Sequence, residues 1–245
     1  MSEVRYSTEG GIATITLDAP DRRNALSVEM SRELIDAART AEADSAVGAV
    51  IVSGGEHFCA GAVRSVLAET GRDPVEDSAY RGLETVYAAF TTIGTIDLPT
   101  IAAVRGAAVG AGLNLALATD LRVVSRTARL LPGFAQIGIH PGGGHLSLLH
   151  RVAGREAAAA MGLFGEEVDG AKAVDLGIAW SAHEDAEVDD AARAIAARTA
   201  ADPELSRRLV RSFRRETAPG GVPWDVAVEL ERSPQMWSLR RKHGD

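Results

Sequence analysis

Two stretches of this chain place glycines and other small residues where an apolar segment ends. They are HFCAGAV at residues 57–63 and GAAVGAGLNLA at residues 106–116. Because little side chain stands in the way, backbone N–H groups at such corners can approach a ligand atom closely. Two corners of this kind can aim two N–H donors at one carbonyl oxygen, which is the arrangement of an oxyanion hole. The pattern therefore predicts a site for chemistry at a carbonyl group.

The glycines also allow another interpretation, namely close packing of a helix on a strand. For one cluster alone that interpretation is favoured, but two clusters of the same kind favour a site. The second cluster is expected to open a helix at Gly110–Gly112, which would present free N–H groups and the positive end of the helix dipole. Asn114 follows Ala111 by three residues, so its side chain is expected on the same face as the Ala111 N–H.

Alternating strands and helices must position these corners. The hydrophobic pattern predicts strands at residues 12–17, 47–52, 101–104 and 121–124. Helices are predicted from the N-cap Ser27 to about residue 41, from Pro74 to about residue 92, and at 109–118, with a polar loop before Pro74. From residue 141 onward the pattern is helical, at 154–163, 169–176, 184–201, 204–215 and around 224–239. This order predicts a layered α/β core with right-handed crossovers, with one domain over residues 1–200 and a helical extension over 201–245.

Composition narrows the function classes. The chain has 245 residues, 46% of them hydrophobic, and a formal net charge of −8, which argues against nucleic acid as a partner. Its one cysteine, Cys59, is expected to be a small buried residue and not a nucleophile, and excludes an internal disulfide. We expect neither a signal peptide nor a membrane span, no metal site, and a cytoplasmic location.

Five blocks in order resemble the crotonase superfamily, also called the enoyl-CoA hydratase/isomerase family. They are PDRRNALS (20–27), IVSGGEHFCAGA (51–62), LPTIAAVRGAAVGAGLNLALATDLRV (98–123), IGIHPGGGHLSLLHRVAG (137–154) and GEEVDGAKAVDLGIAW (165–180). The resemblance covers residue 4 to about residue 200. It implies an α/β spiral of ββα turns with a C-terminal helical region that supports a homotrimer or a dimer of trimers.

The resemblance also implies a ligand and its contacts. The ligand would be an acyl-CoA thioester of fatty acid metabolism, whose carbonyl oxygen is held by the backbone N–H groups of Ala62 and Ala111. Coenzyme A enters as part of the substrate, so no separate cofactor is expected. The positions that line the nucleotide and pantetheine path carry over to Ala25 and Ala60, with three candidate phosphate contacts at Arg22, Arg23 and Arg64.

The chain departs from the family at its acid/base positions. Asn114 stands where hydratases of the family have one glutamate, Phe134 where they have the second, and Val63 replaces the acid of the AGAD-type motif. Hydration needs a base that activates water and an acid that protonates the α-carbon, and neither an amide nor a phenyl ring can exchange a proton at useful pH. Hydration by paired glutamates is therefore not expected, and the isomerase mechanism that keeps the second glutamate fails at Phe134.

His140 and His145 flank the segment Pro141–Gly144, near the expected start of a helix that borders the acyl pocket in relatives. Either histidine could act as an acid or a base. The competing interpretation is a surface or helix-capping histidine, and it is the commoner case. His57, which precedes the first corner, is interpreted as structural.

Three hypotheses follow. The first is an enzyme that uses the oxyanion hole and a substitute proton handler, His140 or His145, in isomerisation, decarboxylation or thioester hydrolysis. The second is a non-catalytic acyl-CoA binding protein that retains the pocket. The third is a slow hydratase in which the backbone and Asn114 position water.

Overall fold

The computed structural model describes residues 2–73 and 76–243. In these residues one six-stranded sheet has the order β1-β2-β3-β4-β6-β9. Its strands are β1 (Val4–Glu9), β2 (Ile12–Leu17), β3 (Ala49–Ser53), β4 (Thr100–Val104), β6 (Leu121–Ser125) and β9 (Ser181–His183). The hairpin β1–β2 is antiparallel and every later pair is parallel. The carboxyl ends of β2, β3, β4 and β6 therefore meet at one edge, where the loops that follow them gather.

A second, smaller sheet has the order β5-β7-β8. It consists of β5 (Ala107–Val109), β7 (Arg129–Leu131) and β8 (Val168–Asp169). β5 pairs parallel with β7 and leads directly into the helix that follows it. This sheet therefore fixes the backbone just before the second glycine corner.

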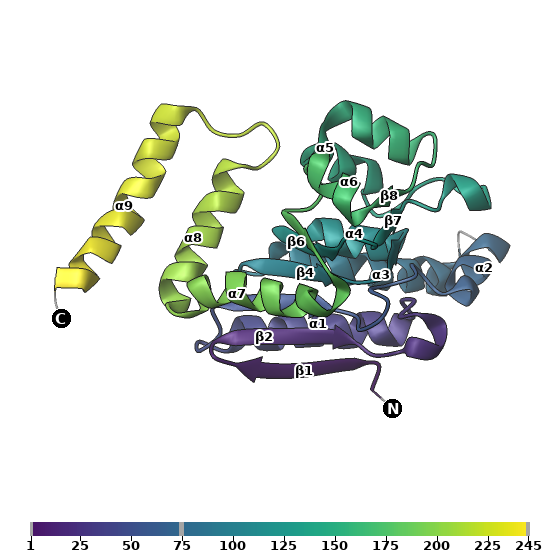
Figure 1. Cartoon of the computed structure of the whole chain (residues 1–245), viewed down its shortest axis with the longest axis horizontal. Coiled ribbons are helices and arrows are strands. Elements are labelled where there is room, and N and C mark those ends of the chain that lie inside the picture. The colour runs from purple at the N-terminus through teal and green to yellow at the C-terminus, as the bar shows by residue number, and fades with distance from the viewer. Residues whose placement is uncertain (1, 74–75, 244–245) are drawn as a thin grey trace.

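Helices cover both faces of the large sheet (Figure 1). They are α1 (Val28–Ala43), α2 (Arg64–Arg72), α3 (Asp77–Thr95), α4 (Ala111–Ala118), α5 (His145–Gly162), α6 (Gly170–Asp175), α7 (Val188–Ala200), α8 (Pro203–Glu216) and α9 (Trp224–His243). α1, α3 and α4 lie on one face, and α7 packs against β2, β3, β4 and β6 on the other.

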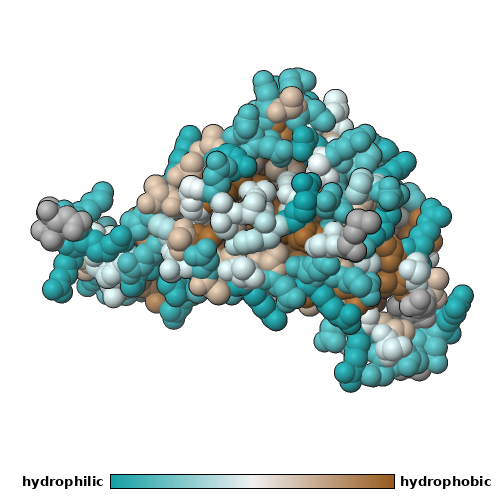
Figure 2. Space-filling model, turned by 90° about the horizontal axis from the view of Figure 1, so that it is seen from below, coloured by the Kyte–Doolittle hydropathy of each residue, from teal (hydrophilic) through white to brown (hydrophobic). Residues whose placement is uncertain are grey.

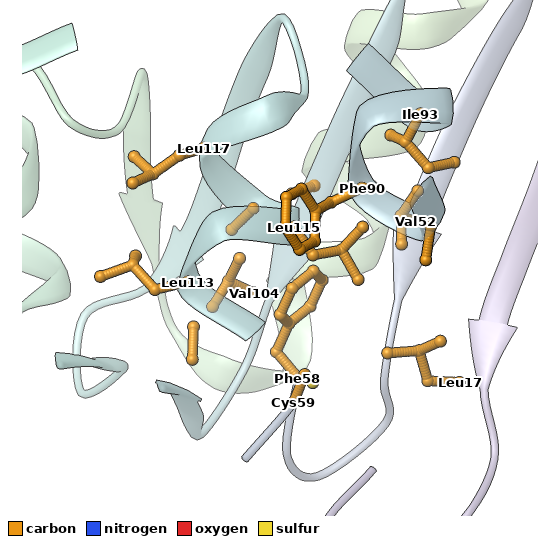
Figure 3. Packing of buried hydrophobic residues seen from close by; sticks show 14 of the residues in the cluster. Leu17, Val52, Phe58, Cys59, Phe90, Ile93, Val104, Leu113, Leu115 and Leu117 are labelled. Atoms are coloured by element: carbon orange, nitrogen blue, oxygen red, sulfur yellow. The ribbon is translucent and has the colours of Figure 1, made fainter. Parts of the chain in front are cut away.

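The alternation of side chains along the strands produces two hydrophobic clusters. Ile15 and Val52 point into the larger cluster with α1, α3 and α4, whereas Ile51 points into the smaller one beneath α7. Figure 3 shows part of the larger cluster, where Phe58 and Phe90 meet residues of α4. Residues 111–117 of α4 are all buried, so this short helix is a fixed element of the core.

α8 and α9 extend away from the sheet (Figure 1). α8 is joined to the core by two arginines. Arg207 donates to the carbonyl oxygens of Glu42 (2.8 Å) and Asp44 (2.7 Å), and Arg214 forms an ion pair of 2.9 Å with Asp120. α9 is joined to α8 through the Trp237 ring, whose centroid lies 3.8 Å from the Arg208 guanidinium carbon and 4.6 Å from that of Arg241.

Most of the predicted elements are confirmed. β2 has the predicted bounds, and Ser27 caps α1 by accepting a hydrogen bond from the Met30 N–H. The predicted polar loop before Pro74 is wrong, because residues 64–72 form α2. The helical pattern predicted from residue 141 onward did not include two short strands, β8 and β9, which form there. Pro74, the predicted start of the next helix, lies outside the described residues.

The surface seen from below is largely hydrophilic, with separate hydrophobic patches (Figure 2). Among the described residues, no helix is both long enough and apolar enough to cross a lipid bilayer.

Candidate active site

Backbone hydrogen bonds fix the corner that carries Ala62 against residues 22–27. The Leu26 N–H donates to the Gly61 carbonyl (2.7 Å), and the Val63 N–H donates to the Leu26 carbonyl (2.9 Å). These bonds bracket Ala62 on both sides and form an isolated parallel bridge between Leu26 and Ala62. The position of the Ala62 peptide is therefore set by main-chain contacts.

The same corner is joined on its other side to the segment that enters α4. The Cys59 N–H donates to the Ala107 carbonyl (3.0 Å), and the Val109 N–H donates to the Cys59 carbonyl (2.9 Å). The side chain of Cys59 is buried, as predicted, and burial raises the pKa of its thiol to about 12. A thiol with that pKa is not a nucleophile near neutral pH, so Cys59 acts as a packing residue.

Two glycines allow the corners to touch. A Cβ built on Gly61, where φ is +99°, would lie 3.0 Å from the Val109 carbonyl oxygen and 3.8 Å from the Ala111 nitrogen. A Cβ built on Gly112 would lie 2.2 Å from the Cys59 carbonyl oxygen. Ala111 is the first residue of α4, so its N–H has no partner within that helix. The structure thus brings the two predicted corners together at backbone atoms.

Asn24 is a site-positioning residue that sequence reasoning missed. Its buried amide donates to the carbonyl oxygens of Gly54 (2.6 Å) and His57 (2.7 Å) and accepts from the Ala19 N–H (2.8 Å). Its φ of 56° is a left-handed conformation that asparagine tolerates better than most residues. An asparagine beside a turn is a weak signal, because two of its three hydrogen bonds reach a segment 30 to 33 residues away.

Asn114 lies in the first turns of α4, and its side chain is buried. Its Nδ2 donates to the Gly142 carbonyl oxygen (3.0 Å), and its Oδ1 lies 2.7 Å from Nδ1 of His145. A carbonyl oxygen only accepts, so the contact with Gly142 fixes which end of the amide is nitrogen. Oδ1 therefore faces the imidazole, and Nδ1 of His145 must be the protonated donor.

His145 is the first residue of α5 and is 1% exposed. Burial lowers the pKa of its imidazole to about 4, because the interior disfavours the charged form. Its Nε2 is buried and has no hydrogen-bond partner within residues 2–73 and 76–243. His145 is thus a neutral imidazole near pH 7, with the proton on Nδ1 and a lone pair on Nε2.

Phe134 contacts the same imidazole. The two ring centroids are 4.9 Å apart with an interplanar angle of 62°, an edge-on arrangement. A Cβ built on Gly110, the residue before Ala111, would lie 3.8 Å from Phe134 Cζ. The phenyl ring therefore lies next to both the second corner and His145. Sequence comparison placed Asn114 and Phe134 at acid/base positions, and the structure shows that both contact His145.

The glycine-rich loop before α5 packs tightly on α3 and α4. A Cβ on Gly142 would lie 2.2 Å from the Tyr87 hydroxyl oxygen, and one on Gly143 would lie 2.4 Å from Phe90 Cζ. Burial raises the pKa of Tyr87, whose oxygen accepts a hydrogen bond from the Gly143 backbone. Side chains at these glycines would push the loop outward, so the glycines keep it over Asn114.

The remaining predicted residues are more exposed or otherwise engaged. His140 is exposed, with Nδ1 2.7 Å from the Pro141 carbonyl oxygen, and is separate from the buried cluster. Arg64 is exposed at the start of α2. Ala60 is half-buried in the first corner.

Arg22 is engaged within the protein. Its guanidinium forms an ion pair of 2.5 Å with Glu3, which holds the pKa of that carboxyl below its usual value, and its Nε donates to the carbonyl of the buried Ala25 (2.9 Å). Arg23 lies beside it and is exposed. Of the predicted phosphate contacts, Arg23 and Arg64 are therefore the more accessible.

A family model described as enoyl-CoA hydratase/isomerase matches residues 7–224. The chain belongs to the enoyl-CoA hydratase/isomerase family. It is 41% identical over 242 residues to the probable enoyl-CoA hydratase EchA14 of Mycobacterium tuberculosis H37Rv, covering 97% of this chain and 92% of that protein.

Solved structures show the same fold. The crystal structure of an enoyl-CoA hydratase from Polaromonas sp. JS666 has a TM-score of 0.88 at 27% identity, covering 98% of this chain and 93% of the other. A structure from Thermobifida fusca YX in complex with acetoacetyl-CoA has a TM-score of 0.84 at 28% identity, covering 98% and 96%. The expected crotonase-type α/β fold is thereby confirmed.

Proposed function

We propose that the protein binds an acyl-CoA thioester and stabilises its enolate through the backbone N–H groups of Ala62 and Ala111. The observation that carries this proposal is the close approach of the two corners, with the position of a Gly61 Cβ only 3.8 Å from the Ala111 nitrogen. Donors built into the backbone need no reorganisation as charge develops on the thioester oxygen, and one such donor contributes about 3–4 kcal/mol to lowering a barrier. The acetoacetyl-CoA complex of a structural relative supports this ligand class.

The acid/base chemistry differs from hydration by paired glutamates. Asn114 holds two hydrogen bonds with its amide and Phe134 has no polar side-chain atom, so neither activates water. The reactions left to the site place negative charge on the thioester oxygen. Isomerisation and decarboxylation do so as an enolate, and thioester hydrolysis does so as a tetrahedral oxyanion. His145 is favoured over His140 as the proton handler because it contacts both replaced positions.

Coenzyme A would enter along residues 22–27 and the first corner, past Ala25 and Ala60. Arg23 and Arg64 are exposed and suited to its phosphates, whereas Arg22 would have to exchange its pair with Glu3. The ligand brings coenzyme A with it, so the proposed chemistry needs no further cofactor.

The reaction is tested by incubating the protein in heavy water with 2-enoyl, 3-enoyl, saturated, malonyl-type and aromatic acyl-CoA thioesters. Mass spectrometry then follows each thioester. Incorporated α-deuterium, a shifted double bond or lost carbon dioxide supports enolate chemistry, whereas released coenzyme A indicates hydrolysis through a tetrahedral oxyanion. Each product identifies its reaction. Hydration of a 2-enoyl thioester at a rate typical of glutamate-bearing relatives contradicts the proposal.

A second candidate function is acyl-CoA binding without turnover. It is favoured by the neutral cluster of Asn114, Phe134 and His145, in which the Nε2 atom of His145 is buried and has no hydrogen-bond partner among the described residues. Binding of acyl-CoA with an unchanged panel in the unmodified protein favours this candidate, and the double substitution Asn114→Glu with Phe134→Glu tests it further. A gain of hydratase activity shows a pocket that is intact but lacks its acids, and a variant that stays inert weakens that interpretation.

The helical extension, residues 201–245, is assigned to assembly into a homotrimer or a dimer of trimers. Its helices α8 and α9 expose large apolar side chains, namely Leu209, Phe213, Trp224, Met236 and Leu239. Exposed apolar surface of this kind is typical of subunit contacts. Light scattering of the intact chain measures the assembly directly. A cytoplasmic location and a role in fatty acid metabolism complete the proposal.

A further inference from the structure

The buried cluster around His145 contains an acceptor atom that the fold leaves unused. Nε2 of His145 has no hydrogen-bond partner in the described part of the chain, although the side chain is 1% exposed. A buried polar atom without a partner is unfavourable, and such atoms in native proteins call for an explanation. Nδ1 of the same ring, in contrast, has a short hydrogen bond of 2.7 Å to Asn114.

The contacts of Asn114 determine which nitrogen of the imidazole is protonated. The Gly142 carbonyl requires the amide nitrogen of Asn114, so the amide oxygen must face His145. The oxygen requires a donor, so Nδ1 carries the proton and Nε2 carries the lone pair. The chain Gly142–Asn114–His145 is therefore a relay of oriented hydrogen bonds that ends in one free lone pair.

We infer that Asn114 is a positioning residue that holds His145 in its Nδ1-protonated tautomer, so that Nε2 takes a proton from the bound thioester. The inference rests on the proposed function. It gives the position of the family's first glutamate a new task, because Asn114 does not exchange a proton itself and acts through the histidine.

The proton transfer balances. The C–H bond at the thioester α-carbon breaks, its proton forms a bond to Nε2, and its electron pair moves onto the thioester oxygen held by Ala62 and Ala111. The imidazolium that results keeps its Nδ1–H bond to Asn114. Return of the proton to the α-carbon restores the substrate, and its delivery to the γ-carbon of an unsaturated acyl chain shifts the double bond.

The basicity of His145 is consistent with this role, and access to its buried Nε2 requires a movement of Phe134. The lowered pKa of His145, about 4, gives the neutral ring the basicity of an ordinary carboxylate. The Phe134 ring lies next to both His145 and Gly110. It would have to turn aside for the α-carbon to reach Nε2.

The first test is the tautomer of His145 in the intact protein. Nitrogen-15 NMR of histidine-labelled protein near neutral pH distinguishes the two neutral tautomers and the imidazolium, with the His145→Gln variant assigning the signal. We expect the Nδ1-protonated form in the unmodified chain and in Asn114→Asp, which keeps the acceptor oxygen. Asn114→Leu, which lacks an acceptor, is expected to shift the ring toward the Nε2-protonated form.

The second test is turnover, scored both as α-deuterium in a saturated thioester and as conversion of a 3-enoyl to a 2-enoyl thioester. The second readout detects proton transfer even when the proton returns without exchange. The turnover rate of His145→Gln is expected to be lower by about 10²–10⁴-fold, as for removal of a general base. The turnover rate of Asn114→Leu is expected to be lower by at least about tenfold. Asn114→Asp is expected to retain more activity than Asn114→Leu. His150→Gln, an exposed histidine on the same helix, is the control and is expected to be unchanged.

The outcomes separate this inference from the proposed function. An imidazolium or an Nε2-protonated ring in the unmodified protein overturns the inference. So does turnover that persists in His145→Gln, although enolate chemistry then stands. An unmodified protein that binds acyl-CoA without turnover overturns both the proton transfer and the enolate chemistry, and leaves binding. Failure to bind acyl-CoA overturns the proposed function itself.

Discussion

The phenyl ring of Phe134 lies edge-on against the imidazole of His145, with the ring centroids 4.9 Å apart. An apolar group thus packs on a histidine at the position that the resemblance assigns to the family's second acid. Together with the Asn114 amide, this contact surrounds His145 with neutral groups. The interior consequently keeps the imidazole uncharged, and this has a measurable effect on stability.

Stability is expected to fall as the pH is lowered from about 6.5 to about 4 because of His145. The folded-state pKa of about 4 lies below the unfolded value of about 6.5, so in this window the unfolded chain binds the proton and the folded chain resists it. Above about pH 6.5 the contribution is fully present. At about pH 5 the loss is roughly 2 kcal/mol in the free energy of unfolding.

Urea unfolding of the unmodified chain and of His145→Gln at about pH 7 and about pH 5 isolates this contribution, because other groups titrate in both proteins. The difference in free energy of unfolding between the two proteins should shrink at the lower pH. A difference that stays constant with pH would show that His145 titrates normally in the folded protein.

Gly112→Ala is expected to destabilise the protein by at least about 2 kcal/mol and to weaken thioester binding. The added Cβ would lie 2.2 Å from the Cys59 carbonyl oxygen, and that backbone atom has no freedom to move without displacing the first corner. Gly71→Ala is the matched control, because no atom lies within 4 Å of its Cβ and the residue is in α2. It should be neutral or stabilise the protein by up to about 1 kcal/mol. Thermal unfolding and titration with acetoacetyl-CoA measure the two effects.

Arg214→Ala is expected to cost about 2–3 kcal/mol of stability. Arg214 pairs with Asp120 at 2.9 Å, both side chains are 21% exposed, and its guanidinium also donates to the carbonyls of Ile96 and Leu98. Its removal would leave a carboxylate and carbonyl groups short of partners in a poorly hydrated position. Arg211→Ala, on the same helix, should change stability by less than about 1 kcal/mol, because its pair with Asp97 is 3.4 Å long and exposed. Equal effects of the two substitutions in urea unfolding would contradict this reasoning.

Cys59 is expected to resist thiol reagents in the folded protein. Its side chain is fully buried and the pKa of its thiol is raised to about 12, so both access and thiolate are lacking. The rate at which a chromogenic disulfide labels the Cys59 thiol should equal the rate of unfolding. Labelling should be complete in denaturant. Rapid labelling of the native chain would mean that the first corner opens readily.

The elements with a strong local signal were predictable. β2 alternates apolar and polar residues and follows a glycine turn, and Ser27 is a serine before an amphipathic segment. Elements without such a signal were missed. α2 is polar and contains Gly71, and β9 has three residues and forms because β6 offers an edge. A short strand whose partner lies over 50 residues away leaves no periodic trace in its own sequence.

The site was predictable in part, and for a physical reason. Glycines mark places where backbone segments must touch, so the two corners were visible, and the resemblance pointed to Asn114 and Phe134. That both positions converge on His145 was not visible, because the contacts join residues 31 and 11 positions apart across a glycine loop. Sequence spacing alone also gave no reason to separate the buried His145 from the exposed His140.

The three-segment backbone network around Ala62 has an evolutionary consequence. The thioester donors that we propose there are main-chain atoms, so substitutions that preserve the backbone leave them in place. Acidic side chains, in contrast, can be lost one codon at a time. A lineage can therefore lose hydratase activity while it keeps the backbone N–H groups that hold the carbonyl. New proton-transfer chemistry can then be selected while these donors stay the same. For descendants of such a scaffold, the glycine corners indicate which ligand is held, and the residues around them decide what happens to it.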